Sequence, residues 1–179
     1  MINDQFRVRE NIYATKGERL GNYIIDRIIF TVAIFLFGML LGMFLAAIDD
    51  VTLLYELENI NPIIDYILSG IFFAFYYILL EGSMQKSFGK MITKTIVVDE
   101  FGNKPKMSAI VGRSFCRMIP FNALSFLGDH ARGWHDSIPN TYVVSVQKLE
   151  NAKKLHNSLK TLGSDNESSE FVNKGSQAI

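Results

Sequence analysis

Two long apolar stretches dominate the pattern of hydrophobic and polar positions. The first follows a polar start, and its stretch from Ile28 to Ile48 contains no charged residue. A helix of roughly 20 apolar residues matches a hydrocarbon core about 30 Å thick. Backbone groups surrounded by lipid must be paired within the segment, which a helix achieves. The pattern predicts a helix that begins near Lys16–Glu18 and spans a membrane over about residues 24–48.

The second apolar stretch runs from Ile63 to Leu80 and follows Asn61-Pro62. A residue before proline is disfavoured in helical conformation, whereas proline itself suits a first helical turn. These residues predict a second membrane-spanning helix at about 63–80. The alternative, a buried helix pair of a soluble protein, is less favoured because two such runs occur in one chain.

The remaining apolar segments are shorter and carry turn signals or charges. The β-branched segments Thr95–Val98 and Thr141–Val146 predict two strands that pair in a small cytoplasmic sheet. Between them, Met107–Gly128 is apolar but contains Arg113, Arg117 and Pro120. Each arginine at the centre of a span would cost about 2.5–3.5 kcal/mol. This segment therefore predicts an amphipathic helix at the inner interface or a half-inserted hairpin broken at Pro120.

Together these patterns predict a mainly α, integral membrane fold. It has two transmembrane helices, a third amphipathic or half-inserted helix, and a small cytoplasmic β element. We expect a cytoplasmic N-terminal segment at residues 1–17 and a membrane domain at residues 18–148. Residues 149–179 are polar, which predicts a disordered cytoplasmic tail.

The charges predict the orientation of the two spans in the bilayer. The loop between them, Asp49–Asp65, carries only negative charges. Basic residues flank the other ends of both spans: Arg7, Arg9, Lys16, Arg19 and Arg27 before or within the first, and Lys86, Lys90, Lys94, Lys104 and Lys106 after the second. Because cytoplasmic loops are enriched in Lys and Arg, we expect both termini in the cytoplasm and the acidic loop outside.

Composition narrows the classes of function. The chain has 18 basic and 18 acidic residues, a balance that does not point to nucleic acid. The single cysteine, Cys116, and three histidines form no recognisable metal motif, and no catalytic triad or dyad can be argued. We therefore expect no enzymatic activity, no metal and no cofactor. The polar start does not read as a cleavable signal peptide.

Several short motifs occur in a characteristic order. They are Arg19 and Asp26 at the start of the first span, SFGK at Ser87–Lys90 before TIVVD, Arg113 with Arg117, and ARGWHDSIPNTYVV at Ala131–Val144. In order and spacing, over about residues 15–146, they resemble the RDD family of bacterial membrane proteins. That family takes its name from an arginine and two aspartates, which match Arg19, Asp26 and Asp136. Many members have a longer apolar segment before the last motif than Phe121–Gly128, which argues against a third full span here.

The resemblance implies a multi-pass protein of the bacterial inner (plasma) membrane. Some family members are described as monovalent-cation/proton antiporters, so it also implies a transport-related role. The lipid bilayer is the expected partner, together with further copies of the chain or another membrane protein, because two helices cannot enclose a pathway.

The charged residues of these motifs are the candidate site. We expect a cytoplasmic-face charge network, or an ion or proton site, formed by Arg19, Asp26, Asp136, Arg113, Arg117, Arg132 and His135. A carboxylate within a span is by default a functional hypothesis, and histidine titrates near neutral pH. The preferred interpretation is structural, with Arg–Asp pairs that hold the first helix to the RGWHD segment. The alternative is proton or cation exchange at Asp26.

The SFGK segment lacks the spacing of a phosphate-binding loop. We expect Gly89 to make a tight turn and Lys90 to meet anionic lipid. Three functions follow from the sequence. The first is a transport-related membrane protein with an inner-face charge network. The second is an oligomeric cation/proton antiporter that uses Asp26, and the third is a membrane scaffold or assembly factor.

Overall fold

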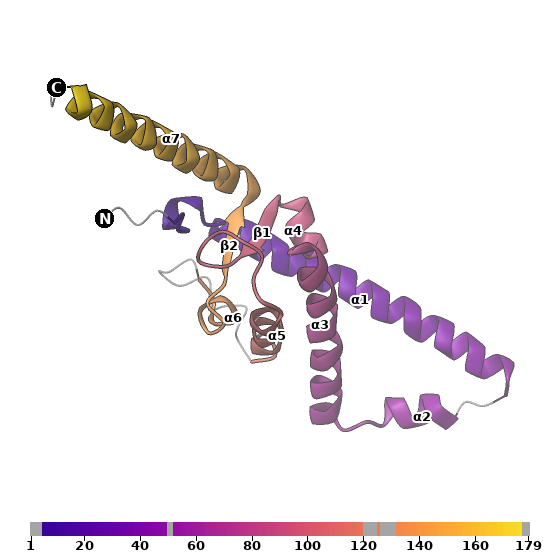
Figure 1. Cartoon of the computed structure of the whole chain (residues 1–179). Coiled ribbons are helices and arrows are strands. Elements are labelled where there is room, and N and C mark those ends of the chain that lie inside the picture. Colours follow the sequence, from indigo (N-terminus) through magenta and orange to yellow (C-terminus); the bar gives the residue numbers. More distant parts are fainter. Residues whose placement is uncertain (1–4, 50–51, 120–124, 126–131, 177–179) are drawn as a thin grey trace.

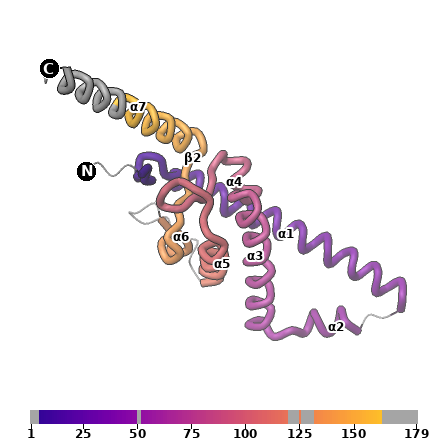
Figure 2. The backbone as a smooth tube through the Cα atoms, viewed as in Figure 1, coloured from indigo at the N-terminus to yellow at the C-terminus, as the bar shows by residue number. Residues whose placement is uncertain are grey.

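The computed structural model describes residues 5–49, 52–119, 125 and 132–176, with side chains described as far as residue 162. Figures 1 and 2 show the path of the chain. The elements, in chain order, are η1 (Glu10–Ile12), α1 (Lys16–Ala47), α2 (Thr52–Glu58), α3 (Pro62–Met84), α4 (Phe88–Ile92), β1 (Thr95–Val98), α5 (Met107–Cys116), α6 (Trp134–Ser137), β2 (Tyr142–Ser145) and α7 (Val146–Ser176).

The two predicted spans are confirmed as long apolar helices, α1 of 32 residues and α3 of 23 residues. A capping box starts α1: the Thr15 hydroxyl accepts from the Glu18 amide at 3.2 Å, and the Glu18 carboxylate accepts from the Thr15 amide at 2.7 Å. The side chain of Asn61 caps α3 ahead of Pro62. Gln85 ends α3 in the left-handed conformation, with a φ of 59°.

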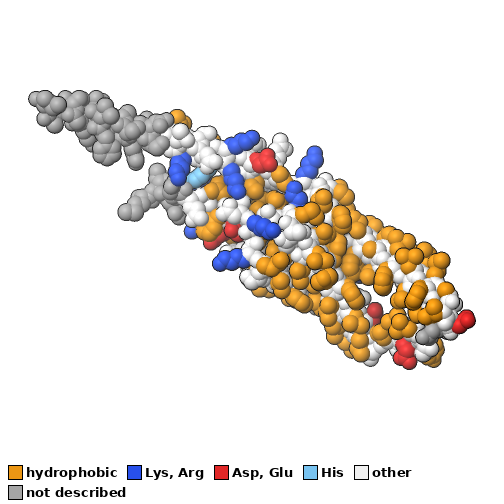
Figure 3. All heavy atoms as spheres, turned by 45° about the vertical axis from the view of Figure 1, so that its right-hand side comes forward, with side chains coloured by type: hydrophobic (Ala, Val, Ile, Leu, Met, Phe, Trp, Pro, Cys, Tyr) orange, Lys and Arg blue, Asp and Glu red, His pale blue; other side chains and the backbone are white. Residues whose placement is uncertain are grey.

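Most of the surface of α1 and α3 is apolar and exposed. Phe35 of α1 is 69% exposed and Ile63 of α3 is 70% exposed, values that suit side chains facing lipid. The two helices diverge from one end of the molecule, and α2 connects them at the other (Figure 1). Figure 3 shows this arm covered by hydrophobic side chains, with acidic side chains at its far tip. The length and exposure of both helices fit a bilayer.

The opposite end, here called the polar end, comprises η1, α4, β1, α5, α6, β2 and the first turns of α1 and α7. The predicted sheet is confirmed: β1 and β2 pair antiparallel, with Thr95 opposite Ser145 and Val98 opposite Tyr142. Val97 and Val143 from the sheet pack with Ile110 of α5. This small core fixes α5 against the sheet beside the ends of the two long helices.

The predicted third helix is confirmed as α5, which buries Ile110, Arg113 and Ser114 while it exposes Met107 and Phe115. Polar Arg113 and Ser114 thus turn inward while apolar Met107 and Phe115 face outward, the reverse of an amphipathic helix on a soluble core. The expected break at Pro120 and the segment 121–124 lie outside the described residues, as do residues 126–131.

The end of the chain differs from the predicted disordered tail at 149–179. There α7 follows β2 directly and is helical from Val146 to Ser176, projecting from the polar end (Figure 1). Leu149 and Ala152 on its first turns pack against Ile12 and neighbouring residues. The ring of His156 meets that of Phe6 edge to face at 5.8 Å. The polar composition of this segment predicted disorder because it shows no apolar periodicity. The first turns of the helix are nevertheless stabilised by packing against the rest of the polar end.

Candidate functional site

The candidate site is a set of buried ion pairs where the polar end meets the long helices. Its first centre is Asp136 on α6, which is fully buried. Its two carboxylate oxygens accept hydrogen bonds from Arg19 of α1 and Arg113 of α5, each at 2.5 Å. Charge-assisted bonds of this kind are stronger than neutral ones. Asp136 therefore joins the first long helix to α5 and α6.

Its second centre is Glu81, in the last turns of α3 and fully buried. Three cations surround its carboxylate: Arg113 Nε at 2.8 Å, Arg117 Nη2 at 3.0 Å and Lys90 Nζ at 3.0 Å. The guanidinium of Arg117 also lies over the ring of Tyr77, at 3.6 Å from its centroid. Because Arg113 contacts both Glu81 and Asp136, it joins the two centres. We call Arg19, Glu81, Lys90, Arg113, Arg117 and Asp136 the charge network.

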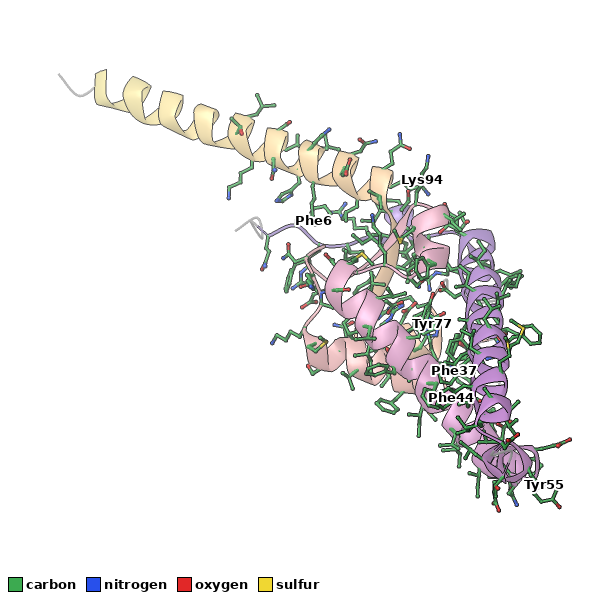
Figure 4. All side chains as sticks on the ribbon, turned by 90° about the vertical axis from the view of Figure 1, so that its right-hand side faces the viewer. Phe6, Phe37, Phe44, Tyr55, Tyr77 and Lys94 are labelled. Atoms are coloured by element: carbon green, nitrogen blue, oxygen red, sulfur yellow. The ribbon has the colours of Figure 1, made fainter. Side chains whose placement is uncertain are left out.

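Asp26 lies apart from these ion pairs, although it is also fully buried within α1. Its carboxylate accepts hydrogen bonds from the hydroxyls of Tyr76 and Tyr77, both at 3.0 Å, from Ser87 Oγ at 2.5 Å and from the Gly89 amide at 2.7 Å. In Figure 4 the Tyr77 side chain lies between the ribbons of α3 and α1. The carboxylate therefore ties α1 to α3 and α4 through uncharged donors.

The SFGK segment differs from its prediction. Gly89 lies within α4 and makes no tight turn; a Cβ at this position would come within 2.4 Å of the Asn22 carbonyl oxygen. Glycine is required because the backbones of α4 and α1 touch there. Lys90 is only 3% exposed, so it is not a surface contact for lipid. Its ammonium group turns inward to Glu81 because burial demands an opposite charge.

The other two predicted site residues lie beside Asp136. His135 Nε2 is 3.7 Å from Asp136 Oδ1. Burial lowers the pKa of His135 to about 3, despite the nearby carboxylate, so the expectation of titration near neutral pH is wrong. Arg132 donates to the Asp136 carbonyl at 3.2 Å, and its guanidinium lies 4.1 Å from the centroid of the Tyr142 ring. Arg132 thus borders the charge network without pairing with its carboxylates.

Neighbouring charged groups keep the buried carboxylate of Asp136 ionised. Burial alone would raise the pKa of Asp136, but Arg113, His135 and Arg19 outweigh it and hold the pKa well below its usual range. Burial lowers the pKa of Lys90, and Glu81 opposes that shift. Such an arrangement can hold elements together and can present fixed charge to a ligand.

A cavity of about 240 Å³ lies against the charge network, between α1, α3 and α5. Arg19, Arg113 and Arg117 line its polar part, and Phe73 and Met118 line an apolar part. Within the described residues, no group of three or more His, Cys, Asp or Glu side chains is placed to hold a metal ion.

Sequence reasoning missed Glu81, Lys90 and Tyr77 as members of the site. The available signal for Glu81 was its position, directly after Leu80 and the apolar stretch of the second helix. A buried carboxylate at the basic end of a span must be paired with cations to be stable, and the sequence contains two candidates, Arg113 and Arg117. The spacing of these residues along the sequence did not predict the contact between α3 and α5 that brings Glu81 and the two arginines together.

The comparisons with known proteins agree with this architecture. No curated protein and no solved structure matches the chain. The RDD family matches it over residues 13–146, a range that contains both long helices, the sheet and every residue of the charge network. With its two apolar helices and its buried charged network, the chain belongs to the RDD family of membrane proteins.

Proposed function

We propose that this protein is a transport-related component of the bacterial inner membrane, whose charge network locks the cytoplasmic ends of its two spans. One observation carries the proposal: Arg113 pairs with Glu81 of α3 and with Asp136, which pairs in turn with Arg19 of α1. A single chain of ion pairs thus connects both spans through α5 and α6. Removing one partner would leave a buried, uncompensated charge.

The position of the cavity supports a transport role over a purely structural one. Its lining continues from the charge network along one face of α3 through Phe73 and Gly70 to Tyr66. Ionisable groups beside a span usually mark a pathway or its gate. Two helices cannot surround a pathway, so the proposal requires several copies of the chain, or another membrane protein, around it.

The distribution of charge supports placing the polar end in the cytoplasm. Arg and Lys side chains gather at the polar end, together with some acidic ones, whereas the charged side chains at the far tip of the arm are acidic (Figure 3). Asp49, Glu56 and Glu58 belong to that tip, in or next to α2. The first described residues and α7 lie together at the polar end, so both ends of the described chain lie on the same side of the molecule (Figure 1).

A second candidate is an oligomeric monovalent-cation/proton antiporter that uses Asp26. A specific observation favours it: Asp26 is a fully buried carboxylate within a span, and its hydrogen-bond donors are hydroxyls and a backbone amide. Among the described residues, the hydrogen bonds to its oxygens come from hydroxyls and an amide rather than from Lys or Arg, so in this candidate mechanism the carboxylate exchanges a proton against a cation when its hydroxyl partners move.

Ion-dependent proton flux in reconstituted vesicles tests both candidates. The wild-type protein is compared with Asp26→Asn and with Glu150→Gln, an exposed charge on α7 that serves as control. Flux in wild type and control that is lost in Asp26→Asn supports the antiporter. Equal flux in all three supports transport without exchange at Asp26.

No flux in any of the three would contradict a transport role for the isolated protein and favour the scaffold alternative. Oligomeric state in detergent adds an independent criterion. A protein that is strictly monomeric at all concentrations would contradict the antiporter, because two helices leave any ion path open to lipid.

A further inference from the structure

The cavity beside the charge network has a cationic lining. Its charged lining residues are Arg19, Arg27, Lys90, Arg113 and Arg117, and its described lining includes no aspartate or glutamate. His135 also lines it but is neutral at pH 7, because burial lowers its pKa to about 3. At about 240 Å³ the cavity has room for a group larger than a single water molecule. A lining of this charge repels cations and attracts anions.

The buried ion pairs hold more positive than negative charge, although each cation contacts a carboxylate. Four cations of the charge network share only two carboxylates, Glu81 and Asp136. Asp26, the third buried carboxylate, does not line the cavity and is held by uncharged donors. An excess of buried charge is costly unless an opposite charge and hydrogen bonds compensate it. The excess of positive charge in the charge network therefore favours binding of an anion.

Two of the lining arginines also keep unused donors. Arg113 is fully buried and Arg19 is 5% exposed, yet Arg113 Nη2 and Arg19 Nε have no hydrogen-bond partner among the described residues. Buried polar groups in folded proteins nearly always have partners, so such donors indicate a missing acceptor. An oxyanion with several acceptor oxygens matches guanidinium donors, which bind phosphate in fixed, often bidentate geometry.

The rest of the lining is apolar and extends away from the charges. Phe73, Met118 and Ile119 line it, and Tyr66 lies at its far side. Tyr66 and Tyr77 are eleven residues apart on α3, which corresponds to about 16 Å along a helix. A ligand with an anionic group at one end and a hydrocarbon chain at the other would match both parts.

We propose that this cavity is a binding site for a phosphate group, carried by an anionic phospholipid or present as free phosphate. Arg113, Arg117 and Arg19 would contact the phosphate oxygens, and the exposed Arg27 would stand at the entrance beside Phe73. The site shares its cavity with the transport proposal but does not rest on that proposal, because binding requires neither Asp26 nor movement of the ligand across the membrane.

The test uses the full chain in neutral detergent with two probes. In the first arm, native mass spectrometry compares retention of phosphatidylglycerol and phosphatidylcholine with identical acyl chains. In the second, equilibrium dialysis measures binding of radiolabelled inorganic phosphate. The variants are Arg117→Gln and Arg27→Gln, and Lys148→Gln removes an exposed charge outside the cavity as the matched control.

We expect wild type and Lys148→Gln to retain one phosphatidylglycerol per chain in preference to phosphatidylcholine. Arg117→Gln should bind about tenfold more weakly, the effect of losing one charge-assisted hydrogen bond. Arg27→Gln should bind about threefold more weakly, since an exposed charge interacts through water. Because Arg27 is exposed and outside the charge network, its variant tests the site even if Arg117→Gln fails to fold.

The two arms distinguish the source of the phosphate. Retention of phosphatidylglycerol without binding of inorganic phosphate identifies a lipid headgroup, whereas binding of inorganic phosphate at comparable strength identifies a site for the free ion. The proposal is overturned if neither probe binds in preference to phosphatidylcholine. It is also overturned if Arg27→Gln binds as tightly as Lys148→Gln, or if a folded Arg117→Gln does.

Discussion

Gly89 of α4 lies directly against the backbone of Asn22 in α1. A Cβ atom at position 89 would be 2.4 Å from the Asn22 carbonyl oxygen and 2.8 Å from its Cα. This approach allows the Gly89 amide to reach Asp26 Oδ1 at 2.7 Å. The absence of a side chain at position 89 therefore allows a backbone amide to join the three hydroxyls that enclose the carboxylate of Asp26.

Gly89→Ala should separate α4 from α1 and lengthen the bond to Asp26. Overpacking of this kind costs about 1–3 kcal/mol. Titration with SDS in mixed micelles measures the free energy of unfolding. Gly38→Ala is the matched control, because nothing lies within 4 Å of a Cβ there and alanine favours helix by up to about 1 kcal/mol. Equal stability of both variants would contradict the close packing of α4.

Glu81→Gln should destabilise the protein more than Asp26→Asn. Glu81 is contacted by three cations, which would keep their buried charge, at a cost of about 3–5 kcal/mol. Asp26 is held by uncharged donors, so its amide variant loses hydrogen bonds worth about 1–3 kcal/mol. The same SDS titration ranks the two, and Glu150→Gln should lie within about 0.5 kcal/mol of wild type. The reverse ranking would place the dominant electrostatic contact at Asp26.

The burial of His135 predicts that the folded protein loses stability as the pH falls. Burial lowers its folded-state pKa to about 3, whereas the unfolded value is about 6.5. The unfolded state therefore binds a proton first, and stability falls as the pH drops from about 6.5 toward 3, by up to about 1.4 kcal/mol per pH unit. Asp136, with its lowered pKa, adds a loss in the same direction at still lower pH.

Unfolding measured at pH 7 and pH 4.5 tests the role of His135. His135→Gln should lose less stability between the two values than wild type, and His156→Gln, on α7, should behave as wild type. A pH dependence unchanged by His135→Gln would show that other groups account for it.

Cys116 tests the orientation of the polar end. It is the single cysteine of the chain and is partly exposed at the end of α5. If the polar end is cytoplasmic, a membrane-impermeant maleimide should not label it in intact cells but should label it in inverted vesicles. Tyr55→Cys in a Cys116→Ser background is the matched control, because Tyr55 is 68% exposed on α2 and should react from outside. Labelling of Cys116 in intact cells would contradict this orientation and place the polar end outside the cell.

The sequence by itself determined the features that depend on local pattern. The apolar stretch Ile28–Ile48 predicted a span because its length matches the bilayer, and β-branched residues at Thr95–Val98 predicted one strand of the pair. The order of its short motifs identified the family, now shown over residues 13–146. These properties follow from neighbouring residues, which the sequence displays directly.

Only the tertiary structure decided which charges meet. Arg19 and Asp26 lie on the same stretch of α1, yet Arg19 pairs with Asp136 and Asp26 with Ser87 and Gly89. The sequence did not indicate a role for Glu81, and the structure shows that it pairs with Arg113 and Arg117. The physical reason is that a buried charge is stabilised by whatever opposite charge the fold places within about 4 Å. Such proximity depends on packing between segments far apart in the chain.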